Sequence, residues 1–220
     1  IANATGDIEK AFPVLLAGLD YDPKNDVYLQ TLATGLLLKA NNVLGRTDLS
    51  QADAQTQLAG NVGTAVQMAR RATQVNPINA MNWLGLARVY ENIIPLTPGA
   101  AEQAVAAYDF ASKLEPNNPQ IFSDLGRTHL AAAQTIAREL KKVSVSESAE
   151  IRKLKNKIEE EYQAAIAMLD KAIQLKPDYA PAHFLLVNVF DRQGKTEEAI
   201  ARAERLKTVF LSDSDPSNDI

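Results

Sequence analysis

The sequence predicts an all-α protein built from tandem pairs of antiparallel helices, and three observations lead to this prediction. Apolar residues recur at spacings of three, four and seven along most of the chain, which is typical of helices with one buried face. Two such patterns alternate, one led by a bulky residue and one led by alanine. The second pattern is closed by proline at four places, and proline ends a helix because it lacks an amide hydrogen and clashes with the preceding turn.

The first pattern is clearest in residues 82–90, where Trp83, Leu86, Ala87 and Tyr90 share one helical face. The same spacing recurs at three other places, so this helix is one of a series. The equivalent residues are Leu29, Leu32, Ala33 and Leu36, then Phe122, Leu125, Gly126 and His129, then His183, Leu186, Val187 and Phe190.

The second pattern is clearest at Ala104, Tyr108, Ala111 and Pro116. The alanines allow two helices to approach closely, and the bulky residue fills the space between them. This order also recurs, and it appears once at the amino end without a first helix. The equivalent residues are Ala11, Leu15, Gly18 and Pro23; Ala65, Ala69, Ala72 and Pro77; Ala165, Leu169, Ala172 and Pro177; and Ala199, Ala203 and Leu206.

This alternation resembles the tetratricopeptide repeat (TPR), a helix–turn–helix unit of about 34 residues with Trp, Leu, Gly, Tyr and then Ala, Phe, Ala, Pro at set places. The resemblance implies a TPR-type α-α solenoid, a superhelix of antiparallel helix pairs. We expect a single domain over 1–212, with a half repeat at 7–23 and repeats at about 24–77, 78–116, 117–177 and 178–211. A disordered acidic tail is expected at 213–220.

The closing prolines lie further apart than the repeat length, so three repeats carry inserts between their two helices. The longest insert continues the apolar spacing on both sides and predicts an extended hairpin of two helices, about 121–142 and 147–176, starting its second helix at Ser146 or Glu147. In residues 41–60 we expect a loop and then an early helix start near Ser50. Residues 93–100 form a proline-bound turn, and Gly194 stops a helix in the last repeat.

The composition excludes several classes of protein. There is no cysteine, which excludes a disulfide framework and a cysteine zinc site. The net charge of −4 argues against a general nucleic-acid binder, and no apolar run approaches the roughly 18 residues of a membrane span. His129 and His183 occupy packing slots without a second metal ligand nearby, and no nucleophile, base and orienting group come together. We therefore expect no catalytic residue, no metal and no cofactor.

The resemblance implies that the first helices of successive repeats line a concave groove that binds a protein or peptide. Arg88 and Arg127 occupy equivalent slots, where they either take a carboxylate in a forked contact, or are solvated or paired with Glu91 and Asp124. The lysine and asparagine set of the family's two-carboxylate clamp is missing, so chaperone-tail binding is not supported. By repeat slot, the groove residues are Gln30, Thr34, Leu84, Arg88, Ser123, Arg127, Phe184 and Asn188.

The tip of the predicted hairpin is basic. Residues 138–157 hold seven Lys or Arg and three Glu, a net charge of +4 in a chain whose total is −4. The tip is either a solubilising surface or a contact for an acidic partner or anionic lipid headgroups, where each positive charge near a membrane is worth ~1 kcal/mol. Its basic residues are Arg138, Lys141, Lys142, Arg152, Lys153, Lys155 and Lys157.

Two stretches, GLDYDPKNDVYLQTLA and residues 75–119, resemble the soluble repeat tail of bacterial O-antigen-ligase-like membrane proteins. This resemblance implies a membrane-tethered module on the extracytoplasmic face, with any catalysis in a membrane domain; a cytoplasmic location is the alternative. It agrees with a first residue other than Met, the half repeat at the amino end and the lack of cysteine. Two functions therefore remain open: a non-enzymatic protein-binding scaffold, and an accessory module of a glycan ligase or polymerase.

Overall fold

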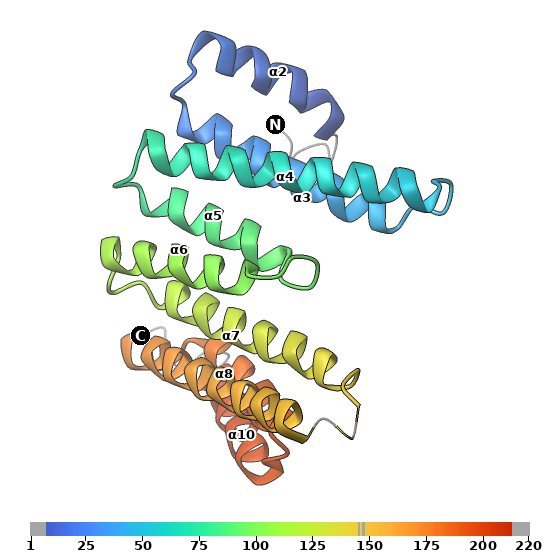
Figure 1. Cartoon of the computed structure of the whole chain (residues 1–220). Coiled ribbons are helices and arrows are strands. Elements are labelled where there is room, and N and C mark those ends of the chain that lie inside the picture. The colour runs from blue at the N-terminus through green and yellow to red at the C-terminus, as the bar shows by residue number, and fades with distance from the viewer. Residues whose placement is uncertain (1–7, 145, 147, 213–220) are drawn as a thin grey trace, which may run out of the picture. The chain divides into compact units, whose positions relative to one another are not determined.

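The computed structural model describes residues 8–144, 146 and 148–212, and in these residues it contains nine helices and no strand (Figure 1). The predicted acidic tail at 213–220 lies outside the described residues. The helices are α2 (Ile8–Tyr21), α3 (Asp26–Leu44), α4 (Gln51–Val75), α5 (Ala80–Asn92), α6 (Ala100–Leu114), α7 (Pro119–Leu140), α8 (Ser148–Leu175), α9 (Ala180–Arg192) and α10 (Thr196–Ser212).

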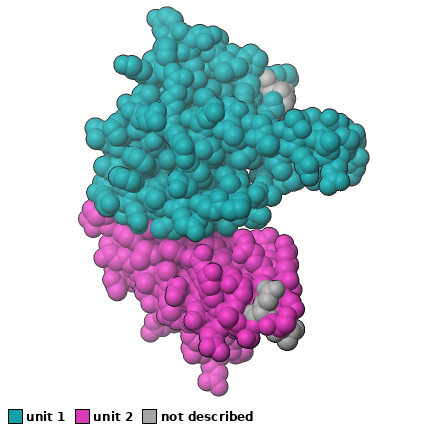
Figure 2. Space-filling view, viewed as in Figure 1, with its two compact units in different colours: residues 1–114 teal, residues 115–220 magenta. Residues whose placement is uncertain are grey.

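The chain divides into two compact units, Ile1–Leu114 and Glu115–Ile220 (Figure 2). Unit 1 holds α2 and the pairs α3/α4 and α5/α6, and unit 2 holds the pairs α7/α8 and α9/α10. The two helices of each pair pack against each other. The boundary between Leu114 and Glu115 falls two residues before the predicted end of the repeat at 78–116, while the individual repeat bounds stay a prediction.

The closing prolines mark the helix ends as the sequence predicts. In all four cases the helix ends two residues before the proline, so that α2 stops before Pro23, α4 before Pro77, α6 before Pro116 and α8 before Pro177. A proline disfavours helical backbone in the residue before it, which explains this constant distance.

The next helix then begins within a few residues, usually from an asparagine. The side chains of Asn25, Asn79 and Asn118 accept hydrogen bonds from the backbone amides of Tyr28, Met81 and Gln120 at 3.0–3.1 Å. These caps stabilise the starts of α3, α5 and α7, because a helix leaves its first amides without internal partners. The sequence analysis did not identify these caps.

Both long inserts are largely helical. The extended hairpin forms from α7 and α8, whose bounds differ from the predicted ones by one or two residues. The second helix begins at Ser148 rather than at Ser146, and Glu147 is outside the described residues. Near residue 50 the predicted helix start is confirmed, because α4 begins at Gln51 and Ser50 Oγ caps it by accepting from the amide of Asp53 at 3.1 Å. However, α3 runs to Leu44, so the loop predicted over residues 41–50 shortens to residues 45–50.

Small residues let the paired helices approach closely. Ala165, Leu169 and Ala172 on α8 are fully buried, as is Tyr108 on α6. A Cβ atom added to Gly126 on α7 would lie 2.5 Å from Cγ of Leu169. Gly126 is therefore a contact point of α7 and α8 where even a methyl group requires Leu169 or the helices to shift. Gly194, with φ of 74°, follows the end of α9 as predicted.

Candidate binding site

The predicted groove residues lie on the first helices of the repeats, which are neighbours within each unit. In unit 1 α3 contacts α5, and in unit 2 α7 contacts α9. Of these residues, three are exposed and three are partly buried. Thr34, Arg127 and Phe184 are exposed, and Gln30, Arg88 and Asn188 are partly buried.

Two residues expected on the groove surface are buried, which corrects their assignment. Leu84 is 2% exposed and Ser123 is 3% exposed. The reason is that each first helix packs on more than one neighbour: α5 contacts α3, α4 and α6, and α7 contacts α8 and α9. The helical face that can meet a ligand is therefore narrower than the repeat slots predict.

In unit 1 the partly buried polar residues belong to an internal network. Gln30 donates to the side-chain oxygen of Asn82, and the Asn82 amide donates to Asp26 at 2.8 Å. Asp26 also accepts from Asn76 at 3.1 Å and from Asn79 at 3.0 Å. These bonds, the one from Asn82 foremost, lower the pKa of Asp26. The network joins α3 to α4 and α5, so Gln30 acts mainly as a structural residue.

In unit 2 the first helices present a mixed face. The guanidinium of Arg127 lies 2.9 Å from Asp124, so the pairing alternative for Arg127 is the one that the structure contains. Its side chain is still 45% exposed. Phe184 on α9 is 58% exposed, and Asn188 one turn later donates to its backbone carbonyl at 3.1 Å.

Both histidines make defined contacts in their packing slots. His183 is 4% exposed, and its Nε2 lies 2.8 Å from the carbonyl of Pro177. In the equivalent slot of unit 1, Trp83 Nε1 donates to the carbonyl of Pro77 at 2.7 Å. His183 thus reproduces the tryptophan contact, which assigns a proton to its Nε2. His129 Nδ1 lies 2.7 Å from Glu161, a pair between α7 and α8.

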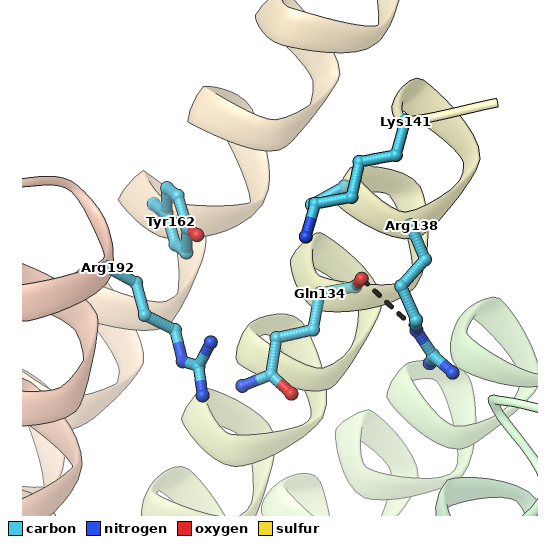
Figure 3. Close-up of a pocket in the computed structure, with 6 residues that line it drawn as sticks. Gln134, Arg138, Lys141, Tyr162 and Arg192 are labelled. Atoms are coloured by element: carbon cyan, nitrogen blue, oxygen red, sulfur yellow. Dashed lines mark hydrogen bonds between the residues drawn. The ribbon is translucent and has the colours of Figure 1, made fainter. Parts of the chain in front are cut away.

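A pocket of about 390 Å³ opens between α7, α8 and α9 in unit 2 (Figure 3). Figure 3 shows the Lys141 ammonium, the Tyr162 hydroxyl and the Arg192 guanidinium facing one space, with the Gln134 amide beside Arg192. This site was not predicted from the sequence, since Arg192 lies 35 residues beyond the basic stretch 138–157 and no spacing relates it to Lys141. Its lining is Gln134, Ala137, Arg138, Lys141, Tyr162 and Arg192.

The groups of the pocket differ in how firmly they are held. Arg138 donates to the carbonyl of Gln134 at 3.4 Å and to the hydroxyl of Thr135 at 2.9 Å. Burial raises the pKa of Tyr162, while the charge of Arg192 acts in the opposite direction. Among the described residues no ion pair involves Lys141 or Arg192.

The remaining basic residues of the predicted tip lie away from this pocket. All are exposed, and Lys153 lies 3.6 Å from Glu150. The structure therefore separates Arg138 and Lys141, which line the pocket, from the rest of the basic stretch. The separate residues are Lys142, Arg152, Lys153, Lys155 and Lys157.

Within the described part of the chain, no group of three or more His, Asp or Glu residues is arranged to hold a metal ion. The same residues include no helix with the length and hydropathy that crossing a bilayer requires.

Comparison with known proteins supports the repeat architecture. Residues 158–214 match the family model described as tetratricopeptide repeat, which covers less than half of the chain. No curated protein matches the sequence.

Two solved structures similar to this chain are of MamA. One is titled "MamA 41-end from Desulfovibrio magneticus RS-1"; it is 14% identical, with 97% of this chain and 92% of that chain covered and a TM-score of 0.62. The other, "MamA RS-1 ArsTM double mutant", is also 14% identical, with 97% and 90% covered and a TM-score of 0.61. At this identity the likeness concerns the fold alone. Together with the helix pairs, it confirms an all-α solenoid of the tetratricopeptide type.

Proposed function

We propose that this protein is a non-enzymatic scaffold that binds an acidic segment of a partner protein on the first helices of unit 2. The observation that carries the proposal is Phe184, a large apolar side chain that is 58% exposed beside Asn188 and on the helix next to Arg127. Aromatic residues such as phenylalanine are enriched at protein interfaces, where a few anchoring residues supply most of the binding energy.

The charges on the proposed protein-binding surface, formed by α7 and α9 around Arg127 and Phe184, favour an acidic partner. Residues 127, 134 and 138 of α7, and residue 141 just after its end, follow helical spacing along one side, and three of the four are basic. The α9 helix adds Arg192 two turns after Phe184. Asp124 neutralises Arg127 in part, which leaves the positive charge concentrated towards the ends of the two helices. Complementary charge speeds association with an acidic segment and orients it.

A selection from a displayed random-peptide library tests the proposal. We expect the selected peptides to be acidic with one apolar anchor, and Phe184→Ser to weaken their binding at least roughly tenfold, as expected for an interface anchor. Ile200→Ser is the matched control, because Ile200 is 55% exposed on α10, a second helix. If Ile200→Ser abolishes binding and Phe184→Ser does not, the binding surface lies on the second helices and the proposal is wrong.

A second candidate is a membrane role, and the exposure of the five tip residues outside the pocket favours it. In this function the basic tip contacts anionic lipid headgroups, and the chain is the soluble module of an O-antigen-ligase-like membrane protein. Wild type should then sediment with anionic vesicles at low salt, and a variant with Gln at Arg152, Lys153, Lys155 and Lys157 should not. Equal sedimentation of the two forms contradicts the lipid contact, and the gene sequence upstream of Ile1 tests the tether.

A further inference from the structure

The pocket between α7, α8 and α9 has the features of a ligand site of its own. We propose that it binds the phosphate group of a small phosphorylated molecule. The site shares Lys141 and Arg192 with the charged end of the proposed protein-binding surface, but it also uses Tyr162 and does not depend on Phe184.

The pocket exists because of the long insert in this repeat. Gln134 and Arg138 lie in the second half of α7, and Lys141 directly follows its last residue; a repeat of about 34 residues lacks this part of the helix. The next first helix, α9, has ordinary length and ends at Arg192. The extra turns of α7 and the end of α9 therefore form two walls, and Tyr162 of α8 forms a third (Figure 3).

Positive charge predominates in the pocket. The lining includes three cations and no carboxylate. Glu159 lies outside the lining but close enough to raise the pKa of Tyr162, and its single negative charge offsets only part of the charge of the three cations. Lys141 and Arg192 are exposed, so an anion can reach them without a large desolvation cost.

The donors suit a phosphate better than a carboxylate. A phosphate monoester carries a charge of about −1.5 to −2 at pH 7 and three acceptor oxygens. The guanidinium of Arg192 can hold two of these oxygens, and the Lys141 ammonium adds a third donor from the facing wall. Tyr162 is a donor at neutral pH because the ordinary pKa of tyrosine lies near 10, and burial raises it further. A carboxylate, with a single charge, leaves the three cations of the lining poorly neutralised.

The size of the pocket indicates a small organic ligand rather than free phosphate. Its volume of about 390 Å³ falls within the roughly 300–1,000 Å³ of small-molecule sites. Ala137 and the ring of Tyr162 supply apolar wall for the rest of the ligand.

Isothermal titration calorimetry with phenyl phosphate, and with benzoate as the carboxylate comparison, tests the proposal. Lys141→Gln and Arg192→Gln should each weaken phenyl phosphate binding about tenfold, as expected for the loss of a charged hydrogen bond. Lys157→Gln is the matched control, because it removes one exposed positive charge outside the pocket. Phe184→Ser should leave the affinity for phenyl phosphate unchanged, which separates this ligand site from the apolar anchor of the protein-binding surface. Circular dichroism verifies that each variant is folded.

Phosphatidic acid vesicles distinguish a phosphate carried by a lipid headgroup from a phosphate carried by a soluble molecule. If the protein binds phosphatidic acid vesicles through Lys141 and Arg192 but does not bind phenyl phosphate, the site takes a lipid headgroup. If it binds phenyl phosphate but not the vesicles, the site takes a soluble ligand. The proposal is overturned if neither probe binds, if benzoate binds as tightly as phenyl phosphate, or if Lys157→Gln weakens binding as much as the pocket variants.

Discussion

Replacing Gly126 by alanine tests how closely α7 and α8 pack. The added Cβ would lie 2.5 Å from Cγ and 2.7 Å from Cδ2 of Leu169, and 3.2 Å from the carbonyl oxygen of Ala165. Carbon atoms pack at about 3.5–4.0 Å, so the helices or Leu169 must move. Leu169 is fully buried, which leaves it little room to do so. We therefore expect Gly126→Ala to destabilise unit 2.

Two opposing effects set the magnitude. Overpacking of a core costs roughly 1–3 kcal/mol, and contacts this short favour the upper part of that range. Alanine, however, is favoured over glycine within a helix by about 0.8–1.0 kcal/mol. The net loss in the free energy of unfolding should be roughly 1–2 kcal/mol.

Glycines elsewhere in the chain provide the matched control. Gly60 and Gly63 lie inside α4, and an added Cβ at either position meets nothing within 4 Å. Gly60→Ala and Gly63→Ala should therefore stabilise the protein by about 0.4–1 kcal/mol.

Urea unfolding followed by far-UV circular dichroism measures these changes. The single tryptophan, Trp83, lies in unit 1, so its fluorescence does not report directly on Gly126. A double-mutant cycle with Leu169→Ala identifies the cause, because removal of the Leu169 side chain removes the clash. The coupling between the two changes should be roughly 0.5–3 kcal/mol. Stabilisation by Gly126→Ala equal to that by Gly60→Ala would refute the close approach.

Three further substitutions test other contacts, each by urea unfolding beside wild type. Trp83→Ala should lower the free energy of unfolding by roughly 1–3 kcal/mol, because the indole stacks on Phe110 with ring centroids 4.4 Å apart. The loss should be smaller than for a fully buried tryptophan, because Trp83 is partly exposed. An unchanged midpoint of urea unfolding would contradict the packing role. His183→Ala should lower the free energy of unfolding by roughly 1–3 kcal/mol, since the carbonyl of Pro177 loses its hydrogen-bond partner. An unchanged free energy of unfolding would show that water replaces the imidazole. In the folded protein the pKa of Asp26 lies below its value of about 3.9 in the unfolded chain. The ionised carboxylate therefore stabilises the fold fully at pH values above about 3.9, and this contribution is lost as the pH falls through the folded-state pKa. Asp26→Asn should thus be less stable than wild type at pH 7, and the difference should shrink below about pH 4; a constant difference would contradict the linkage.

Local patterns were sufficient to predict the helices and where most of them end. Closing prolines act on the residues next to them, so their effect can be predicted from the sequence. The same is true of the Ser50 cap, of Gly194 after α9 and of the apolar spacing that extends α7 and α8. The helical extension of α3 to Leu44 was missed, because Asn41 and Asn42 suggest a turn but tolerate a helix whose other face is buried.

The binding surfaces depended on tertiary structure. Leu84 and Ser123 occupy slots that the repeat pattern assigns to the groove, but contacts with a second neighbouring helix cover them. The pocket likewise combines Lys141, Tyr162 and Arg192 from three helices that no sequence spacing relates. Helical periodicity determines which residues share a face of one helix, and those relations are local. Which face meets a neighbour, and which charges then lie opposite each other, is decided by how the helices pack around Gly126 and the buried alanines.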